Sequence, residues 1–178
     1  MIPEQTQNPQ DMRSAFIVVD MQNAMFHGAH APHDGDFVVR RVCALVERAR
    51  REEVQIVFVQ HAGDGCAHGS DGWRLISALR PQFPDWVIDK LGASIFSGTN
   101  LGAQLKAVGI KRLILAGAST DDGIAASCRE AVDRGFEVVL AGDAHTLRAH
   151  DAEARIAHHN AALSGPARVL EAGEVAFA

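Results

Sequence analysis

Short runs of consecutive apolar residues recur along the chain and are separated by longer amphipathic segments. The clearest runs are SAFIVVD (14–20), VQIVFVQ (54–60) and RLILAG (112–117). Apolar runs of this length, bounded by polar residues or glycine, are typical of strands buried on both faces of a parallel sheet. Shorter segments of the same kind predict further strands at 85–90, 137–141 and 169–170.

The segments between these runs have helical periodicity. Val38, Val42, Leu45 and Ala49 recur at helical spacing within a charged background, and similar patterns predict helices over about 101–108, 122–134 and 153–163. Strands that alternate with helices form right-handed βαβ units. The sequence therefore predicts an α/β fold with three layers, in which a doubly wound, Rossmann-type parallel sheet carries helices on both faces.

Length, charge and cysteine content narrow the class of protein. The 178 residues, with no repeat or linker, predict one domain over 14–178 behind a flexible leader at 1–13. The formal net charge is −5 and the basic residues are dispersed, so we expect no nucleic-acid partner. The apolar runs are too short to span a bilayer, and no secretory signal is visible, so we expect no membrane partner and a cytoplasmic location. Three widely spaced cysteines do not suggest a disulfide framework.

Polar residues stand where the predicted strands end. In doubly wound sheets, ligands bind at the carboxyl ends of the strands, near the point where strand order reverses. This rule selects the segment from Asp20 to Gln22, His61, Lys90 and the loop 117–123 as one candidate site.

Three segments in this order resemble a known family. VVDMQNAMF (18–26), KLGASIFSGTNL (90–101) and LILAGASTDDGIAASCREAVDRGFEVVLAGDAHT (113–146) are similar to the motifs of the isochorismatase-like hydrolases, within the cysteine hydrolase superfamily. One such motif alone would be a weak signal. The resemblance covers about 14–146 and supports the predicted fold.

The resemblance implies a catalytic aspartate, lysine and cysteine. Asp20 and Lys90 match the first two, but Gly123 stands at the position of the nucleophilic cysteine. Glycine excludes acyl-enzyme chemistry through this position. Cys128 lies five residues further along the predicted helix, on its apolar stripe, and is expected to be a buried structural thiol. An amidase that uses Cys128 would require a reactive thiol of low pKa.

Some members with a small residue at this position are isochorismatases, which cleave a vinyl ether and release pyruvate. The resemblance then implies Asp20 as the general acid and Lys90 as the group that holds a substrate carboxylate, and it implies a cis peptide at 118–119. We predict substrate contacts in the same region from Gln22, Phe26, Ser119 and Thr120. Alternatively, Gln22 is a solvated loop amide or orients Asp20, and Asp121 and Asp122 are acids that match a helix dipole.

The expected ligand is a small molecule, with an anion as one option, and we expect no metal and no cofactor. The aspartate that would pair with a metal-binding histidine two residues later is absent, because Val59 stands two residues before His61. Family members commonly form homo-oligomers, so a homo-oligomer is expected. The alternative is a family member without activity that serves as a small-molecule-binding or oligomeric scaffold, its cavity filled by a side chain such as Phe26 or Phe96.

Overall fold

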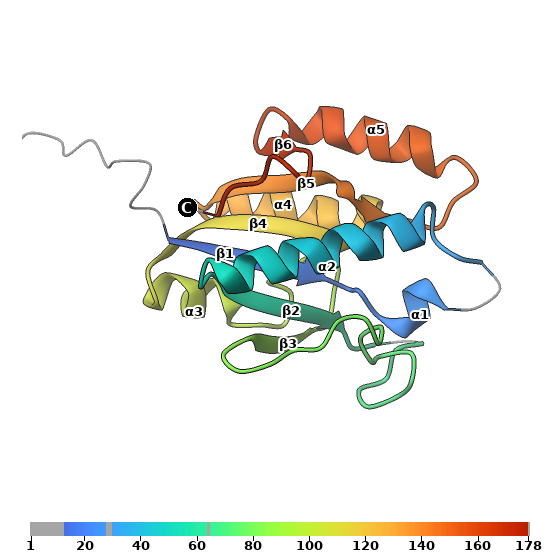
Figure 1. The fold of residues 1–178 in the computed structure, drawn as a ribbon, viewed down its shortest axis with the longest axis horizontal. Helices are drawn as coiled ribbons and strands as arrows, with labels where there is room; N and C mark the ends of the chain where they lie inside the picture. Colours follow the sequence, from blue (N-terminus) through green and yellow to red (C-terminus); the bar gives the residue numbers. More distant parts are fainter. Residues whose placement is uncertain (1–12, 28–29, 64, 178) are drawn as a thin grey trace, which may run out of the picture.

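In the computed structural model, a single parallel sheet lies between two layers of helices (Figure 1). The structure describes residues 13–27, 30–63 and 65–177. The predicted leader, 1–13, lies outside the described residues except for Arg13, which begins the first strand. Among the described residues, no helix is long and apolar enough to cross a membrane.

The sheet has six strands in the order β3-β2-β1-β4-β5-β6, and every neighbouring pair is parallel. The strands are β1 (Arg13–Val19), β2 (Gln55–His61), β3 (Trp86–Lys90), β4 (Ile110–Ala118), β5 (Glu137–Thr146) and β6 (Arg168–Leu170). Strand order reverses between β1 and β4, so the crevice at their carboxyl ends is the expected ligand position. The α/β, doubly wound fold predicted from the sequence is confirmed.

Helices cover both faces of this sheet (Figure 1). They are α1 (Asn23–Phe26), α2 (Gly35–Arg51), α3 (Leu101–Ala107), α4 (Ala125–Asp133) and α5 (Ala152–Leu163), with a π-helical turn at Thr120–Ile124 before α4. Helix α2 places its apolar stripe against one face of the sheet, with Phe16 and Phe58. Helices α3 and α4 pack on the other face, with Leu113 and Leu115. Helices α2 and α4 each bury one stripe because their apolar residues recur at helical spacing.

Two details of the chain bring β1 and β4 together at their carboxyl ends. Gly117 has a φ of 130°, and a Cβ there would lie 2.1 Å from the carbonyl oxygen of Val19, so only glycine allows the strands to approach this closely. Asp20, directly after β1, has a φ of 48°, in the left-handed region that aspartate tolerates better than most residues. The chain therefore turns sharply where the site begins.

Candidate active site

A buried ion pair forms the centre of the candidate site. Asp20 follows β1, Lys90 ends β3, and Lys90 Nζ lies 2.8 Å from Asp20 Oδ2. The side chain of Lys90 is only 2% exposed and that of Asp20 is 14% exposed. The two residues are 70 positions apart in the sequence, and the parallel order β3-β2-β1 brings them to the same edge of the sheet.

The ammonium group of Lys90 has its hydrogen-bonding capacity filled by the chain. Besides Asp20 Oδ2, Nζ donates to the carbonyl oxygens of Gly92 at 2.9 Å and Ala93 at 3.0 Å. A lysine ammonium has three N–H donors and no acceptor. Lys90 therefore acts on Asp20, and holding a substrate carboxylate, as the sequence suggested, would require one of these bonds to break.

The carboxyl group of Asp20 is adapted to hold a proton. Burial raises its pKa from the usual 3.8 to about 6, against the lowering effect of the Lys90 charge and hydrogen bond, and the charge of Asp122 raises it further. Its second oxygen, Oδ1, is buried and has no hydrogen-bond partner among the described residues. An acid of this pKa is protonated in a useful fraction of molecules near neutral pH, as general-acid catalysis requires.

Gly123 faces this carboxyl group. A Cβ at position 123 would lie 3.1 Å from Asp20 Oδ2, 3.0 Å from the carbonyl oxygen of Ala118 and 3.4 Å from Val19 Cγ1. A side chain at this position would thus contact Asp20 directly, which is the relation expected between a nucleophile and its base. The peptide bond Ala118–Ser119, at the start of this turn, is cis, as the resemblance implies.

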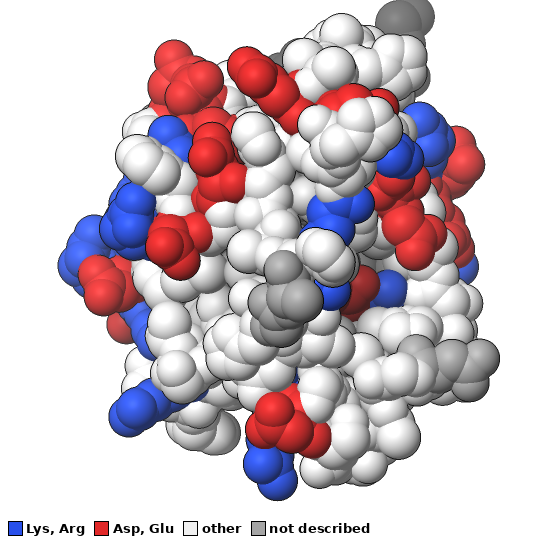
Figure 2. All heavy atoms as spheres, turned by 90° about the vertical axis from the view of Figure 1, so that its right-hand side faces the viewer, with Lys and Arg blue, Asp and Glu red and all other residues white. Residues whose placement is uncertain are grey.

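The pair borders a cavity of about 310 Å³ at the carboxyl ends of the strands. Figure 2 looks onto this face of the molecule, which is hollowed where acidic and basic side chains meet. The cavity is lined by Asp20, Gln22, Ala24, Met25, His61, Cys66, Lys90, Gly92, Ala93, Ser119 and Asp122. Four of the predicted site residues are therefore brought together, namely Asp20, Lys90, Gln22 and Ser119.

Gln22 lines the cavity, but its amide is already engaged with the chain. Nε2 donates to the carbonyl oxygens of His61 and Trp73, at 3.0 and 2.8 Å, and Oε1 accepts the backbone N–H of His61 at 2.8 Å. Gln22 is 2% exposed. We therefore interpret it as a support that joins the residues after β1 to those after β2.

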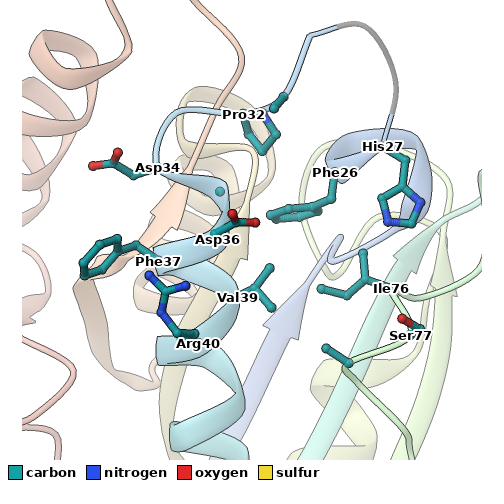
Figure 3. A pocket seen from close by; sticks show the side chains of 13 residues that line it. Phe26, His27, Pro32, Asp34, Asp36, Phe37, Val39, Arg40, Ile76 and Ser77 are labelled. Atoms are coloured by element: carbon teal, nitrogen blue, oxygen red, sulfur yellow. The ribbon is translucent and has the colours of Figure 1, made fainter.

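Two predicted substrate contacts lie away from this cavity. Thr120 is fully buried, and its hydroxyl contacts Nδ1 of His145 at 2.9 Å. Phe26 lines a different pocket of about 500 Å³, and its ring points towards Asp36 and Val39 at the start of α2 (Figure 3). The sequence placed both residues near the ends of buried strands, but it did not reveal which way their side chains turn.

Three further residues line the cavity, of which His61 and Asp122 lie in the region that the sequence selected and Cys66 does not. His61 ends β2 beside the cavity, Cys66 comes from the long segment after β2, and Asp122 lies in the π-helical turn. The position of His61 at a strand end was a usable signal. The segment around Cys66 has no periodicity, so its course over the site could not be foreseen.

None of the three cysteines has the lowered pKa of an activated nucleophile. Cys128 is fully buried, and burial raises the pKa of its thiol to about 12, which agrees with the structural role expected for it. Cys66 is in the cavity, but burial and the charge of Asp20 raise its pKa above the ordinary value. Cys43 is half-buried, and its pKa is also raised by burial. A thiol needs a lowered pKa to be a strong nucleophile.

Among residues 13–27, 30–63 and 65–177, no group of three or more His, Cys, Asp or Glu side chains is arranged to hold a metal ion.

Comparisons with known proteins identify the family. Residues 14–173 match the family model of the isochorismatase domain. A streptothricin hydrolase from Streptomyces noursei is 35% identical over 136 residues, which cover 74% of this chain and 49% of the relative. Nicotinamidase 3 from Arabidopsis thaliana is 26% identical over 154 residues, covering 77% and 75% of the two chains.

Solved structures share the fold. The crystal structure of N-carbamoylsarcosine amidase from Thermoplasma acidophilum superposes with a TM-score of 0.79 and 26% identity, covering 92% of this chain and 99% of the amidase. This chain spans about half the length of the two streptothricin hydrolases that it matches, 49% of one and 53% of the other. The match to the family model covers almost the whole described chain and includes every element of the site. The chain belongs to the isochorismatase family.

Proposed function

We propose that the protein is a hydrolase of small molecules that uses Asp20 as a general acid and forms no covalent intermediate. One observation carries this proposal. Asp20 has a pKa of about 6, is paired with Lys90 and borders an open cavity, while the residue that faces it at the nucleophile position is a glycine. Such a site can deliver a proton but offers no side chain for attack at position 123.

Hydrolysis of an enol ether is the reaction that these residues fit best. Protonated Asp20 transfers its proton to the enol-ether carbon, which leaves an oxocarbenium ion. Water adds to the cationic carbon and loses a proton to the Asp20 carboxylate. The resulting hemiketal breaks into a ketone and an alcohol, and the acid is regenerated. Lys90 stabilises the carboxylate while it is ionised. Burial disfavours the ionised form and so favours return of the proton to Asp20.

Isochorismate is the reference substrate for this chemistry, because the family resemblance implies it and its cleavage gives pyruvate and a dihydrodiol acid. Relatives are named streptothricin hydrolase and nicotinamidase, and the second name suggests an amide substrate instead. Amide cleavage by thiolate attack is disfavoured here, because Gly123 has no thiol and the pKa of Cys66 and Cys128 is raised. Cytoplasmic location and assembly into a homo-oligomer stay predictions.

The alternative role as an inactive scaffold has a structural criterion. A scaffold could have its cavity filled by Phe26 or Phe96. Phe96 instead packs in the core beside α3, Phe26 lines the neighbouring pocket, and the cavity next to Asp20 is open. The retained ion pair and open cavity favour the hydrolase.

The test is the release of pyruvate from isochorismate, measured at saturating substrate so that weak binding does not conceal turnover. Asp20→Asn keeps the shape of the side chain and removes the acid. We expect turnover by the wild type and a loss of about 10²- to 10⁴-fold in the variant. Turnover that the variant retains would contradict the role of Asp20, and no turnover by the wild type would contradict enol-ether hydrolysis.

A further inference from the structure

The hydrogen-bond donors and acceptors that line the cavity differ in how far they are already bonded within the chain. The three N–H donors of Lys90 are occupied by Asp20, Gly92 and Ala93, and both donors of the Gln22 amide are occupied by backbone carbonyls. The hydroxyl of Ser119 donates to Asp121 Oδ1 at 2.9 Å. The donors of Lys90, Gln22 and Ser119 are therefore engaged with the chain itself, and the ring of His61 is the other nitrogen-bearing side chain of the lining.

Acceptors, by contrast, are left over. Asp20 Oδ1 has no hydrogen-bond partner among the described residues. Asp122 is exposed at the rim of the cavity, and no ion pair or hydrogen bond of its carboxylate is found within the described part of the chain. Because Oδ1 of Asp20 is closed off from solvent, the acceptor that a ligand can reach is the carboxylate of Asp122, and a complementary ligand brings a donor or a positive charge to it.

The formal charges of the residues that line the cavity also favour a ligand that carries a positive charge. The charges of Asp20 and Lys90 compensate each other at 2.8 Å, which leaves Asp122 as the uncompensated charge among the residues that line the cavity. The negative charge of Asp122 also acts on the centre of the site, because it raises the pKa of Asp20. The lining residues include no other lysine or arginine that could receive an anion.

The two neighbouring aspartates of the π-helical turn have different positions. Asp121 accepts the Ser119 hydroxyl and forms an ion pair with Arg155 of α5, so it fixes the turn to the rest of the fold. Asp122 has no such structural partner among the residues described and instead lines the cavity. The sequence interpretation of both as helix-dipole acids is therefore incomplete for Asp122.

We infer that Asp122 is a specificity residue that selects substrates carrying a cationic, donor-rich group, such as a protonated amine or an amidinium, beside the bond cleaved at Asp20. This inference rests on the proposed function, because it names the substrate class of the same site. It also means that isochorismate, a dicarboxylate, tests the chemistry of the site but is not the substrate that its charges favour.

The direct test is binding of three ring compounds of similar shape, benzamidine (cation), benzamide (neutral) and benzoate (anion), by calorimetry at low salt. Low salt is needed because screening weakens an exposed charge pair. The wild type is expected to bind benzamidine most tightly and benzoate most weakly. Asp122→Asn is expected to weaken benzamidine binding by about 3- to 10-fold and to leave benzamide unchanged.

The matched control is Asp133→Asn. Asp133 is exposed at the other end of the following helix, α4, so this variant removes the same charge outside the cavity. We expect it to change none of the three affinities. Benzoate binding as tight as benzamidine binding, no benzamidine binding, or equal effects of the two variants would overturn the inference.

A kinetic arm separates the inference from the proposed function. With isochorismate, Asp122→Asn should lower KM by a few fold through loss of repulsion, and it should also lower the pKa seen in the pH profile, because the charge of Asp122 raises the pKa of Asp20. An unchanged or higher KM would contradict the inference while hydrolysis itself stands. If the protein binds benzamidine through Asp122 but hydrolyses no enol ether, the inference on charge stands and the proposed reaction fails.

Discussion

Replacing Asp20 with asparagine should change the pH dependence of folding stability as well as activity. Burial raises the pKa of Asp20 from 3.8 to about 6. One pH unit of difference corresponds to about 1.4 kcal/mol, so ionising Asp20 costs about 3 kcal/mol more in the folded chain than in the unfolded chain.

The direction of this pH dependence of stability follows from proton binding. Between about pH 4 and pH 6, the folded protein holds this proton while the unfolded chain has released it. Stability from this group is therefore lost as the pH rises through that window. Because asparagine cannot ionise, the free energy of unfolding of Asp20→Asn relative to the wild type should increase by about 2 kcal/mol from pH 4 to pH 7.

Denaturant unfolding of both proteins at several pH values between about 4 and 7.5 measures this difference. Asp133→Asn, which removes an exposed acid, is the control and should show almost no pH-dependent difference from the wild type. A difference curve for Asp20→Asn that is flat, or that decreases as the pH rises, would refute a raised pKa at Asp20.

Two further variants act on the same carboxyl group. Because Lys90 lowers the pKa of Asp20, Lys90→Met should raise that pKa and move the pH profile of activity to higher pH, which initial rates measure; a shift to lower pH would contradict the assigned ion pair. In Gly123→Cys, the new Cβ would lie 3.1 Å from Asp20 Oδ2, so Asp20 can take the thiol proton. Iodoacetamide should then label Cys at position 123 near neutral pH and leave the buried Cys128 unlabelled, as peptide mass spectrometry can show; the reverse pattern would refute the position of the turn.

The fold was predictable because its central strands, β1, β2 and β4, are almost entirely buried. Runs such as 113–117 have no polar residue on either face, so they identify central parallel strands without further information. The end of β5 was less predictable. The sequence placed its end at 141, because Gly142 and Asp143 interrupt the apolar run. In the structure the strand runs to Thr146, and its backbone still pairs with β4 beyond these two residues.

The centre of the site was also predictable from position. Asp20 and Lys90 each stand at the end of a strand, and parallel strands place these ends at one edge. The orientation of single side chains was not predictable. Asp121 and Asp122 are adjacent in sequence, yet one binds Arg155 and the other lines the cavity, which depends on the π-helical turn. No local pattern indicated this turn.

The central claim is that Asp20 is the general acid, and the pH dependence of kcat/KM for isochorismate tests it most directly. This quantity reports ionisation of the free enzyme. With a pKa of about 6 at Asp20, we predict that kcat/KM falls as the pH rises above about 6, approaching 10-fold per pH unit, and that Asp20→Asn lacks this decrease. A profile that rises with pH, or one that Asp20→Asn shares with the wild type, would contradict the account.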